Sequence, residues 1–562
     1  MTRPPSKEPP ENRAVSAPSP ESPAGALAAR LAGVRAASRL ARRDANVFSV
    51  AAEPAIATAI TGRLGWLDAP RAFLDRVAEL DGLSDETTRA GLTGVHLLGM
   101  GGSSLGAEVL RDVAADRTLR LTVLDTTDER AVRHATETLD PERALFIVAS
   151  KSGSTLEVSA LERHFSGVMA DRLDRPAGDH FVAITDPGSP LVELAADRGY
   201  RRVFENPADI GGRYSVLSYF GLIPAALLGL DLRRLLADAV DMADACTADT
   251  ADNPGLALGA FMAAQALAGR DKLTLLLPPR LAPLGVWIEQ LVAESTGKRG
   301  RGILPIVGEP LGEPADYGDD RAFVAMLTPD TGDLDAAART LELAGHPVCR
   351  IAGTGDALGR EFYRWEFATA IAGAALDVNP FDEPDVRAAK DRTTAQLEAR
   401  RRTGSFRVDP PLTRQRGYAR REHGEVAGGP GRYLALLDYL PTDGRRPMIV
   451  ERLRAAIRHR TQMATTHGTG PRYLHSTGQY HKGGPNTGVF VLLTGGDAST
   501  TPVPDTDYSF SALKQAQALG DFDALVAAGR TVIHYHVDDP AADYTETFER
   551  ILKQLRMPDP TG

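Results

Sequence analysis

The sequence predicts an α/β protein with two parallel sheets, each covered by helices on both faces, followed by a C-terminal α/β extension. Short apolar segments typical of buried strands alternate with longer segments of helical periodicity. Glycine, serine or aspartate follows several of these strands, as expected where a parallel strand ends and a helix begins. With 562 residues, the chain can form several domains with large cores.

The composition argues against several classes of protein. Lysine and arginine number 64 against 74 aspartates and glutamates, and a net charge of −10 argues against a general nucleic-acid binder. Two cysteines, Cys246 and Cys349, cannot form a disulfide framework, and we predict that both are buried in a reducing compartment. No apolar segment is long enough to span a membrane, and the first residues lack the pattern of a signal peptide. We therefore expect a cytoplasmic protein with no nucleic-acid and no membrane partner.

Changes in composition divide the chain into six predicted segments. The first is rich in proline and serine, which predicts a disordered tail, and the second has helical periodicity. Two sheet-forming domains follow, then a basic, glycine-rich linker or loop, and then the C-terminal α/β segment. In order, these segments are residues 1–24, 25–90, 91–250, 251–398, 399–432 and 433–562.

Strands and helices are predicted in each sheet-forming segment from apolar runs and helical spacing. In the first domain the strands are Val95–Leu98, Leu121–Leu124, Ala144–Ala149 and Phe181–Thr185, with helices that end near Val113 and start near Leu156. In the second domain the strands are Lys272–Leu277, Phe323–Leu327 and Val348–Ile351, with helices at Val286–Ser295 and Glu361–Leu376. In the C-terminal segment the strands are Tyr433–Leu437, Val489–Leu493 and Thr531–Val537, with helices near Arg445–Arg460 and after the last strand.

The loop after the third strand predicts a phosphate site. It places four hydroxyl groups, a lysine and a glycine at the start of a helix, in the order Ser150, Lys151, Ser152, Gly153, Ser154 and Thr155. Backbone N–H groups and the helix dipole favour an anion there. Capping of the helix needs only one or two of the hydroxyls, so the others are available to a phosphomonoester.

A second glycine-rich turn, Gly99–Ser104, follows the first strand. It is similar to a dinucleotide-binding turn, with Asp125 as a conceivable ribose ligand, but Ser104 stands at the third glycine position. The fingerprint is therefore weak.

The two loops on one sheet resemble those of the sugar-isomerase (SIS) family, and five motifs in order narrow the resemblance to the glucose-6-phosphate isomerase family. The motifs are Gly99–Ser104, Ser150–Thr155, Gly211-Gly212-Arg213-Tyr214-Ser215, Glu294-Ser295-Thr296-Gly297-Lys298, and Phe381-Asp382-Glu383-Pro384 followed by Lys390. The resemblance spans about Leu92–Lys390. The stretch from His475 to Gly488 resembles the isomerase half of bacterial bifunctional transaldolase/glucose-6-phosphate isomerase proteins. A transaldolase barrel has no room before the first strand.

The resemblance implies roles for individual residues. It implies that Glu294 is the base that moves a proton between C1 and C2 of the sugar, and that Arg213 stabilises the enediolate. It implies that Lys390 assists ring opening. The substrate- and phosphate-binding residues that it implies are Gly102, Ser103, Ser150, Lys151, Ser152, Ser154, Thr155, Gly212 and Glu383. Glu383 departs from the family, which usually has glutamine at this position.

One departure affects ring opening. The family usually has a histidine after the base motif, supplied from a neighbouring subunit, but no histidine lies between His180 and His346 in this chain. Asp320, His475 and His481 are the candidates for its role, and for either histidine a merely structural role is an equal alternative.

These expectations lead to one preferred function and two alternatives. The preferred function is reversible conversion of D-glucose 6-phosphate to D-fructose 6-phosphate in glycolysis and gluconeogenesis, with no cofactor and no metal. The alternatives are an isomerase of another anionic sugar, such as mannose 6-phosphate or a sulfosugar, and a non-catalytic sugar-phosphate sensor. The only partner expected besides the sugar phosphate is a second copy of the chain in a possible homodimer.

Overall fold

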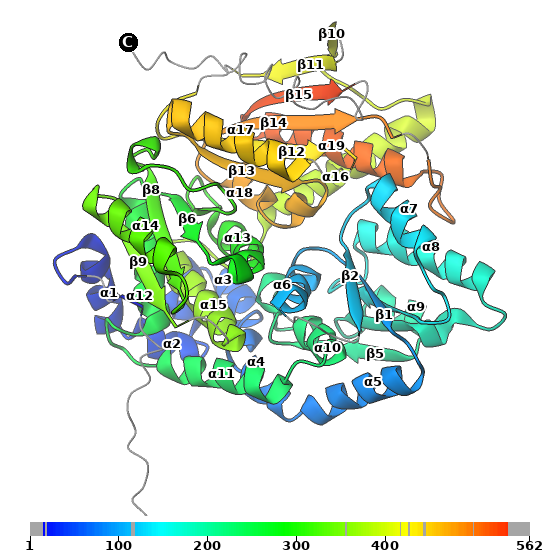
Figure 1. The fold of residues 1–562 in the computed structure, drawn as a ribbon, viewed down its shortest axis with the longest axis horizontal. Coiled ribbons are helices and arrows are strands. Elements are labelled where there is room, and N and C mark those ends of the chain that lie inside the picture. Colours follow the sequence, from blue (N-terminus) through cyan, green and yellow to red (C-terminus); the bar gives the residue numbers. More distant parts are fainter. Residues whose placement is uncertain are drawn as a thin grey trace, which may run out of the picture.

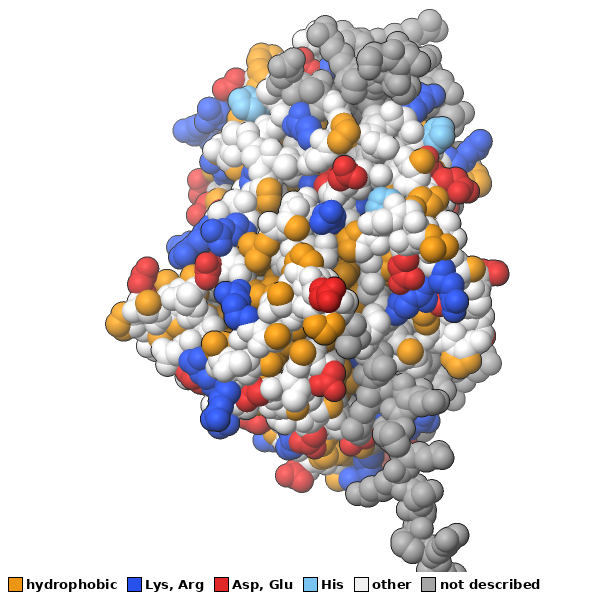
Figure 2. All heavy atoms as spheres, turned by 90° about the vertical axis from the view of Figure 1, so that its left-hand side faces the viewer, with side chains coloured by type: hydrophobic (Ala, Val, Ile, Leu, Met, Phe, Trp, Pro, Cys, Tyr) orange, Lys and Arg blue, Asp and Glu red, His pale blue; other side chains and the backbone are white. Residues whose placement is uncertain are grey.

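A computed structural model describes residues 15–16, 19–113, 119–353, 357–415, 418–424, 428–441, 446–497 and 500–537. In this part of the chain the strands form three sheets (Figure 1). The first and second sheets lie side by side, and the C-terminal sheet lies across one end of both. On the face drawn in Figure 2, acidic and basic side chains are interspersed with apolar ones.

The first sheet has five parallel strands in the order β2-β1-β3-β4-β5. Its strands are β1 (Gly94–Gly99), β2 (Arg120–Leu124), β3 (Ala144–Ala149), β4 (Phe181–Thr185) and β5 (Arg202–Glu205). The connecting helices are α6 (Leu105–Val113), α7 (Glu129–Glu137), α8 (Leu156–Arg172) and α9 (Pro190–Asp197). Every residue of β3 and β4 is buried, because central parallel strands are covered on both faces.

The second sheet has four parallel strands in the order β7-β6-β8-β9. Its strands are β6 (Lys272–Leu276), β7 (Leu304–Ile306), β8 (Arg321–Leu327) and β9 (Val348–Ala352). The helices before, within and after it are α10 (Tyr219–Leu227), α11 (Leu232–Ala245), α12 (Pro254–Leu267), α13 (Ala282–Thr296), α14 (Gly332–Leu343), α15 (Leu358–Ala375) and α16 (Pro384–Thr403).

The third sheet has six strands in the order β10-β11-β15-β14-β12-β13 and is mixed. Its strands are β10 (Thr413–Gln415), β11 (Tyr418–His423), β12 (Tyr433–Tyr439), β13 (Ala464–Thr469), β14 (Gly488–Gly495) and β15 (Thr531–Val537), of which β10 and β11 are antiparallel to their neighbours. Its helices are α17 (Arg446–Thr461), α18 (Gly478–Gly483) and α19 (Phe510–Ala527). These three sheets confirm the predicted fold class.

The N-terminal helices support the first two sheets. They are α1 (Pro23–Gly33), α2 (Ala36–Ala41), α3 (Pro54–Thr61), α4 (Ala69–Leu74) and α5 (Val77–Arg89). One apolar cluster joins them to both sheets and includes the buried Trp66, Trp287 and Trp365. The indole of Trp66 packs 5.1 Å from the ring of Tyr214, so the helical lead-in supports the backbone next to Arg213.

The structure corrects the sequence prediction at several elements. The predicted linker at 399–432 contains the last turn of α16 and the strands β10 and β11. Strands β5, β7 and β13 were not expected, because they are short, contain proline, or are rich in threonine and histidine. Most of the predicted tail and the predicted terminal helix lie outside the described residues, but Val15 pairs with Ile351 and α1 begins at Pro23.

Candidate active site

The loop from Ser150 to Thr155 joins β3 to α8 at the edge of the first sheet where a phosphate site is predicted. Its hydroxyl groups bond within the loop: Ser150 Oγ lies 2.9 Å from Thr155 Oγ1, and Ser154 Oγ lies 3.2 Å from Ser152 Oγ. Thr155 is the N-cap residue of α8, yet its side chain makes no capping hydrogen bond. The amides at the start of α8 therefore have no capping side chain and remain available to an anion.

Lys151 is held by an ion pair at the mouth of this loop. Its ammonium group contacts the carboxylate of Asp186 and donates to the carbonyl oxygen of Ala208 at 3.3 Å. Burial lowers the pKa of Lys151, while Asp186 acts in the opposite direction. The positive charge that the sequence assigns to phosphate binding is thus balanced by the carboxylate of Asp186.

Arg213 is buried, and five contacts around its guanidinium group fix its position. Nε donates to Ser295 Oγ at 2.9 Å, and Nη2 donates to the carbonyl oxygens of Pro380 and Asp382, each at 2.8 Å. Nη1 lies 3.0 Å from Glu383 Oε2 and 3.5 Å from Glu294 Oε1. Because two carboxylates share one guanidinium, this cluster carries a net negative charge when both are ionised.

Glu294 lies in the last turn of α13 and is 8% exposed. Its Oε2 accepts a hydrogen bond from Gln290 Nε2 at 3.1 Å. Burial raises the pKa of Glu294; the charge of Arg213 opposes this shift and the charge of Glu383 adds to it. The pKa of Glu383 is lowered because Arg213 outweighs its burial. The raised pKa of Glu294 makes it a stronger base, whereas the lowered pKa of Glu383 keeps its carboxylate ionised.

The glycine turns predicted to line the sugar lie against each other. The 3-10 turn Gly101–Ser103 contacts the 3-10 turn Gly212–Tyr214, and a Cβ atom on Gly102 would collide with the carbonyl oxygen of Gly212. Glycine is therefore required at Gly102 by close backbone approach. Ser103 is buried at this contact.

His475 comes from the third sheet region into the same site. Its Nε2 lies 2.9 Å from Glu157 Oε1, which also accepts from Gln517 Nε2 at 2.7 Å. The carbonyl oxygen of His475 accepts from Gln290 Nε2 at 2.7 Å, so one amide group bridges His475 and Glu294. The pKa of Glu157 is lowered: burial raises it, but His475 and Lys390 outweigh the burial.

A cavity of about 270 Å³ lies beside His475 and Glu157, and neither Glu294 nor Arg213 is among the residues that line it. Ser154, Glu157, Lys390, His475 and Gln517 are among the residues that line it. The structure thus places a phosphate-loop hydroxyl, the predicted ring-opening lysine and one of the candidate histidines around one space.

The other two candidates for the missing histidine lie elsewhere. His481 is buried in the core of the third sheet, where its ring stacks on Tyr433 and its Nδ1 lies 3.0 Å from the Tyr433 hydroxyl. Asp320 pairs with Lys272 Nζ at 3.3 Å and is not among the residues that line the cavity. His475 is the candidate that the geometry favours.

Sequence reasoning missed Glu157, Gln290 and Gln517. Two of them carry a signal in hindsight: Glu157 follows the phosphate loop at the start of α8, and Gln290 precedes Glu294 by one helical turn. Gln517 carries none, because its approach to Glu157 depends on how α19 packs. Among the described residues, no group of three or more His, Cys, Asp or Glu side chains is arranged to hold a metal ion. None of the described helices is long and apolar enough to cross a membrane.

Comparison with known proteins agrees with this geometry. The family model for phosphoglucose isomerase matches residues 36–302. A glucose-6-phosphate isomerase of Rubrobacter xylanophilus is 30% identical over 410 residues, covering 64% of this chain and 94% of the relative. A probable glucose-6-phosphate isomerase of Haloarcula marismortui is 30% identical over 345 residues, covering 54% of this chain and 78% of the relative. The crystal structure of a hypothetical protein from Thermus thermophilus superposes with a TM-score of 0.58 at 25% identity, covering 66% of this chain and 96% of that one. The chain belongs to the phosphoglucose isomerase family.

Proposed function

We propose that this protein is an enzyme that interconverts D-glucose 6-phosphate and D-fructose 6-phosphate, a step of glycolysis and gluconeogenesis. Relatives that match this chain over nearly their whole length are named glucose-6-phosphate isomerases. The observation that carries the proposal is the buried Glu294, fixed between Arg213 and Gln290 and joined through Gln290 to His475. This arrangement supplies a base for proton transfer next to an acid–base group for ring opening.

The phosphate group of the sugar binds the loop from Ser150 to Thr155. The hydroxyls of Ser150, Ser152, Ser154 and Thr155 and the amides at the start of α8 donate to the phosphate oxygens. Lys151 adds a cation whose pairing with Asp186 sets its position.

His475 and Lys390 open the sugar ring. The Glu157 carboxylate is ionised and can only accept hydrogen bonds, so Nε2 of His475 carries the proton that it shares with Glu157. The remaining nitrogen, Nδ1, is then free to exchange a proton with the sugar. Lys390, across the same cavity, donates to the ring oxygen as the C1–O or C2–O bond breaks.

Glu294 then carries the proton between C1 and C2. Its raised pKa makes it a stronger base than an exposed glutamate, and Arg213 offsets the negative charge that develops on the enediolate oxygens. Gly102, Ser103 and Gly212 form the backbone wall that positions the open chain. Glu383 holds Arg213 from the opposite side to Ser295 and adds to the basicity of Glu294.

All of these groups come from one chain. In this proposal His475 of the same polypeptide takes the role of the histidine that the family usually draws from a neighbouring subunit. Both cysteines are free and buried, which fits a reducing compartment and a cytoplasmic enzyme.

A coupled assay of the purified protein with fructose 6-phosphate tests the proposal. The Glu294→Gln variant should lose isomerisation by at least about 10³-fold, because an amide cannot take up the proton, and should still bind the sugar phosphate. Glu366→Gln is the matched control: Glu366 is buried on α15, and burial raises its pKa well above the ordinary value, so its neutral form resembles glutamine. Near-normal turnover by Glu294→Gln would contradict the assignment.

A further inference from the structure

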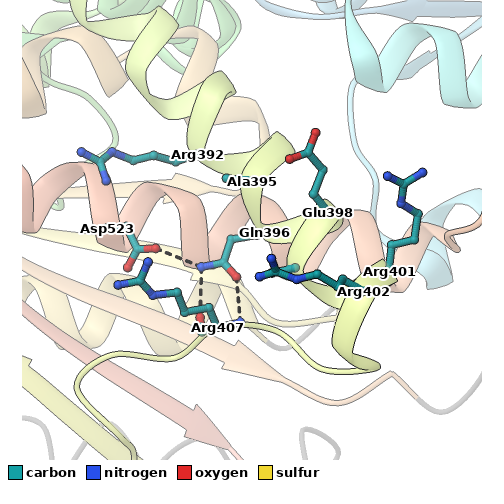
Figure 3. A pocket seen from close by; sticks show the side chains of 9 residues that line it. Arg392, Ala395, Gln396, Glu398, Arg401, Arg402, Arg407 and Asp523 are labelled. Atoms are coloured by element: carbon teal, nitrogen blue, oxygen red, sulfur yellow. Dashed lines mark hydrogen bonds between the residues drawn. The ribbon is translucent and has the colours of Figure 1, made fainter.

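A second cavity lies on α16, on residues that the proposed reaction does not use. We call it the arginine cleft; it has a volume of about 810 Å³, and its charged and polar lining residues are Arg392, Arg401, Arg402, Arg407, Gln396, Glu398 and Asp523 (Figure 3). None of the residues that line it also lines the candidate active-site cavity. Arg401, Arg402 and Arg407 belong to the basic stretch that the sequence predicted to be a linker.

The positive charges of the arginine cleft are weakly neutralised. Among the described residues, no carboxylate lies within ion-pair distance, 4.0 Å, of Arg392 or Arg402. Arg401 and Arg407 make only long contacts of 3.9 Å, to Asp507 and Asp409, and their side chains are 72% and 77% exposed. Such exposed pairs hold a guanidinium only weakly, so all four remain available to a ligand.

The backbone around the cleft is held in place before any ligand binds. Gln396 is 3% exposed; its Oε1 accepts from the amide of Arg407, and its Nε2 donates to the carbonyl oxygen of Arg407, both at 3.0 Å. The same Nε2 lies 2.9 Å from Asp523 Oδ2 on α19. The guanidinium of Arg400 stacks over the ring of Phe406 at 5.5 Å. The loop that carries Arg407 is therefore held to α16, and α16 is held to α19.

The spacing of the arginines indicates the ligand. Arg392 and Arg402 are ten residues apart on α16, which places their backbones about 15 Å apart along the helix. Figure 3 shows the Arg402 side chain directed toward Gln396, at the middle of the cleft, and Arg401 directed away from it. One phosphate group can engage only one or two guanidinium groups, whereas two or more phosphates in one molecule can engage several of the four. Guanidinium binds phosphate oxygens in pairs, with geometry that lysine cannot reproduce.

We propose that the arginine cleft binds a small anion that carries two or more phosphate groups. The cleft volume lies within the range of about 300–1,000 Å³ that is typical of small-molecule sites. A nucleic acid fits less well, because the chain carries a net charge of −10 and the basic residues gather at one confined cleft. Inorganic polyphosphate, a nucleoside triphosphate and a sugar bisphosphate share the required chemistry.

Calorimetric titration of the full-length protein with tripolyphosphate tests this site. Saturating fructose 6-phosphate is present to occupy the phosphate loop, and the ionic strength is held constant. We expect the Arg402→Gln/Arg407→Gln double variant to bind tripolyphosphate at least tenfold more weakly than the wild type. The Arg143→Gln/Arg339→Gln double variant is the control, because it removes the same charge from two side chains that are 65% and 69% exposed elsewhere. Parallel titrations with adenosine triphosphate and fructose 1,6-bisphosphate show whether the cleft prefers inorganic polyphosphate, a nucleoside triphosphate or a sugar bisphosphate.

A variant that should strengthen tripolyphosphate binding complements the arginine variants, which should weaken it. Asp523→Asn keeps an oxygen for Gln396 but removes a carboxylate that lines the cleft, so it should tighten tripolyphosphate binding. No binding by the wild type, or equal weakening in both double variants, would overturn the proposal. So would binding of single-stranded DNA that is as tight as that of tripolyphosphate and equally sensitive to Arg402→Gln/Arg407→Gln. Because binding is read without turnover, failure here is independent of failure of the isomerase assignment.

Discussion

Replacing His475 separates ring opening from proton transfer, the two halves of the proposed reaction. His475 faces the cavity that Lys390 and Ser154 line, whereas Glu294 lies on the other side of the Gln290 bridge. A positioned acid–base group contributes about 10²–10⁴-fold to its step, or about 3–5 kcal/mol of activation free energy. We therefore expect His475→Ala to lower kcat/KM for fructose 6-phosphate by that factor wherever ring opening limits the rate.

The carboxylate partner should contribute less than the histidine itself. Glu157 holds His475 through one charge-assisted hydrogen bond of 2.9 Å in a buried setting, worth about 1.5–3 kcal/mol. Glu157→Gln should thus cost about 10–100-fold in kcat/KM, and it should cost nothing further in the His475→Ala background.

An open-chain analogue provides the decisive assay. The C5 hydroxyl supplies the ring oxygen of both sugars, so 5-deoxyfructose 6-phosphate cannot close its ring and needs no ring opening. His475→Ala should isomerise this analogue at close to the wild-type rate, while Glu294→Gln should fail with both substrates. The control is His459→Ala, since His459 has a 76% exposed side chain. Equal losses by His475→Ala on the cyclic and the open-chain substrate would refute the role given to His475.

Three further predictions follow from burial and close contact. Glu294 must be ionised to act, and its pKa is raised, so kcat/KM should fall on the acid side at a higher pH than for an ordinary glutamate. Glu383→Gln removes a neighbouring negative charge and should move this acid-side fall of kcat/KM to lower pH. A shift to higher pH would contradict the effect of the Glu383 charge on Glu294. Gly102→Ala should reduce activity at least about 100-fold, because the added methyl group meets backbone at the contact of two turns, whereas Gly33→Ala, with open space around it, should be neutral. Arg321→Met should lower the free energy of unfolding in urea by about 3–5 kcal/mol, because it leaves the buried carboxylate of Glu309 without its ion-pair partner at 2.9 Å. A loss under about 1 kcal/mol would show that the Arg321–Glu309 pair is not essential for stability.

The sequence predicted the central strands better than it predicted the edges of the sheets. β3, β4 and β15 were predicted at their observed bounds; for β3 and β4 the reason is that buried parallel strands are continuous apolar runs. β11 was missed because its charged side chains suit an edge region rather than a buried strand. The prediction of a linker at 399–432 was wrong for a related reason. Glycine and arginine dominate the composition of this segment, while backbone pairing with β15 determines its structure.

The choice among Asp320, His475 and His481 shows where sequence reasoning ends. All three were compatible with an acid–base role, because residue type and local spacing do not fix which cavity a side chain enters. The tertiary packing separates the three: His481 lies against Tyr433 in a core, Asp320 pairs with Lys272, and His475 contacts Glu157 of the first sheet region.

In the proposed mechanism the C-terminal third is therefore part of the catalytic centre and not an accessory to it. Helix α19 makes the connection through three buried polar contacts on one face: Lys514 Nζ to Asp128 Oδ2 at 2.9 Å, Gln517 Nε2 to Glu157 Oε1 at 2.7 Å, and Tyr473 Oη to Asp521 Oδ2 at 2.6 Å. The first two join α19 to the first sheet region, and the third joins it to the turn that carries His475. Buried polar groups are costly unless every partner is in place, so these contacts fix one docking position for the third sheet. That position brings His475 within hydrogen-bond distance of Glu157, and under the proposed mechanism it lets one chain supply the group that the family usually draws from a neighbouring subunit.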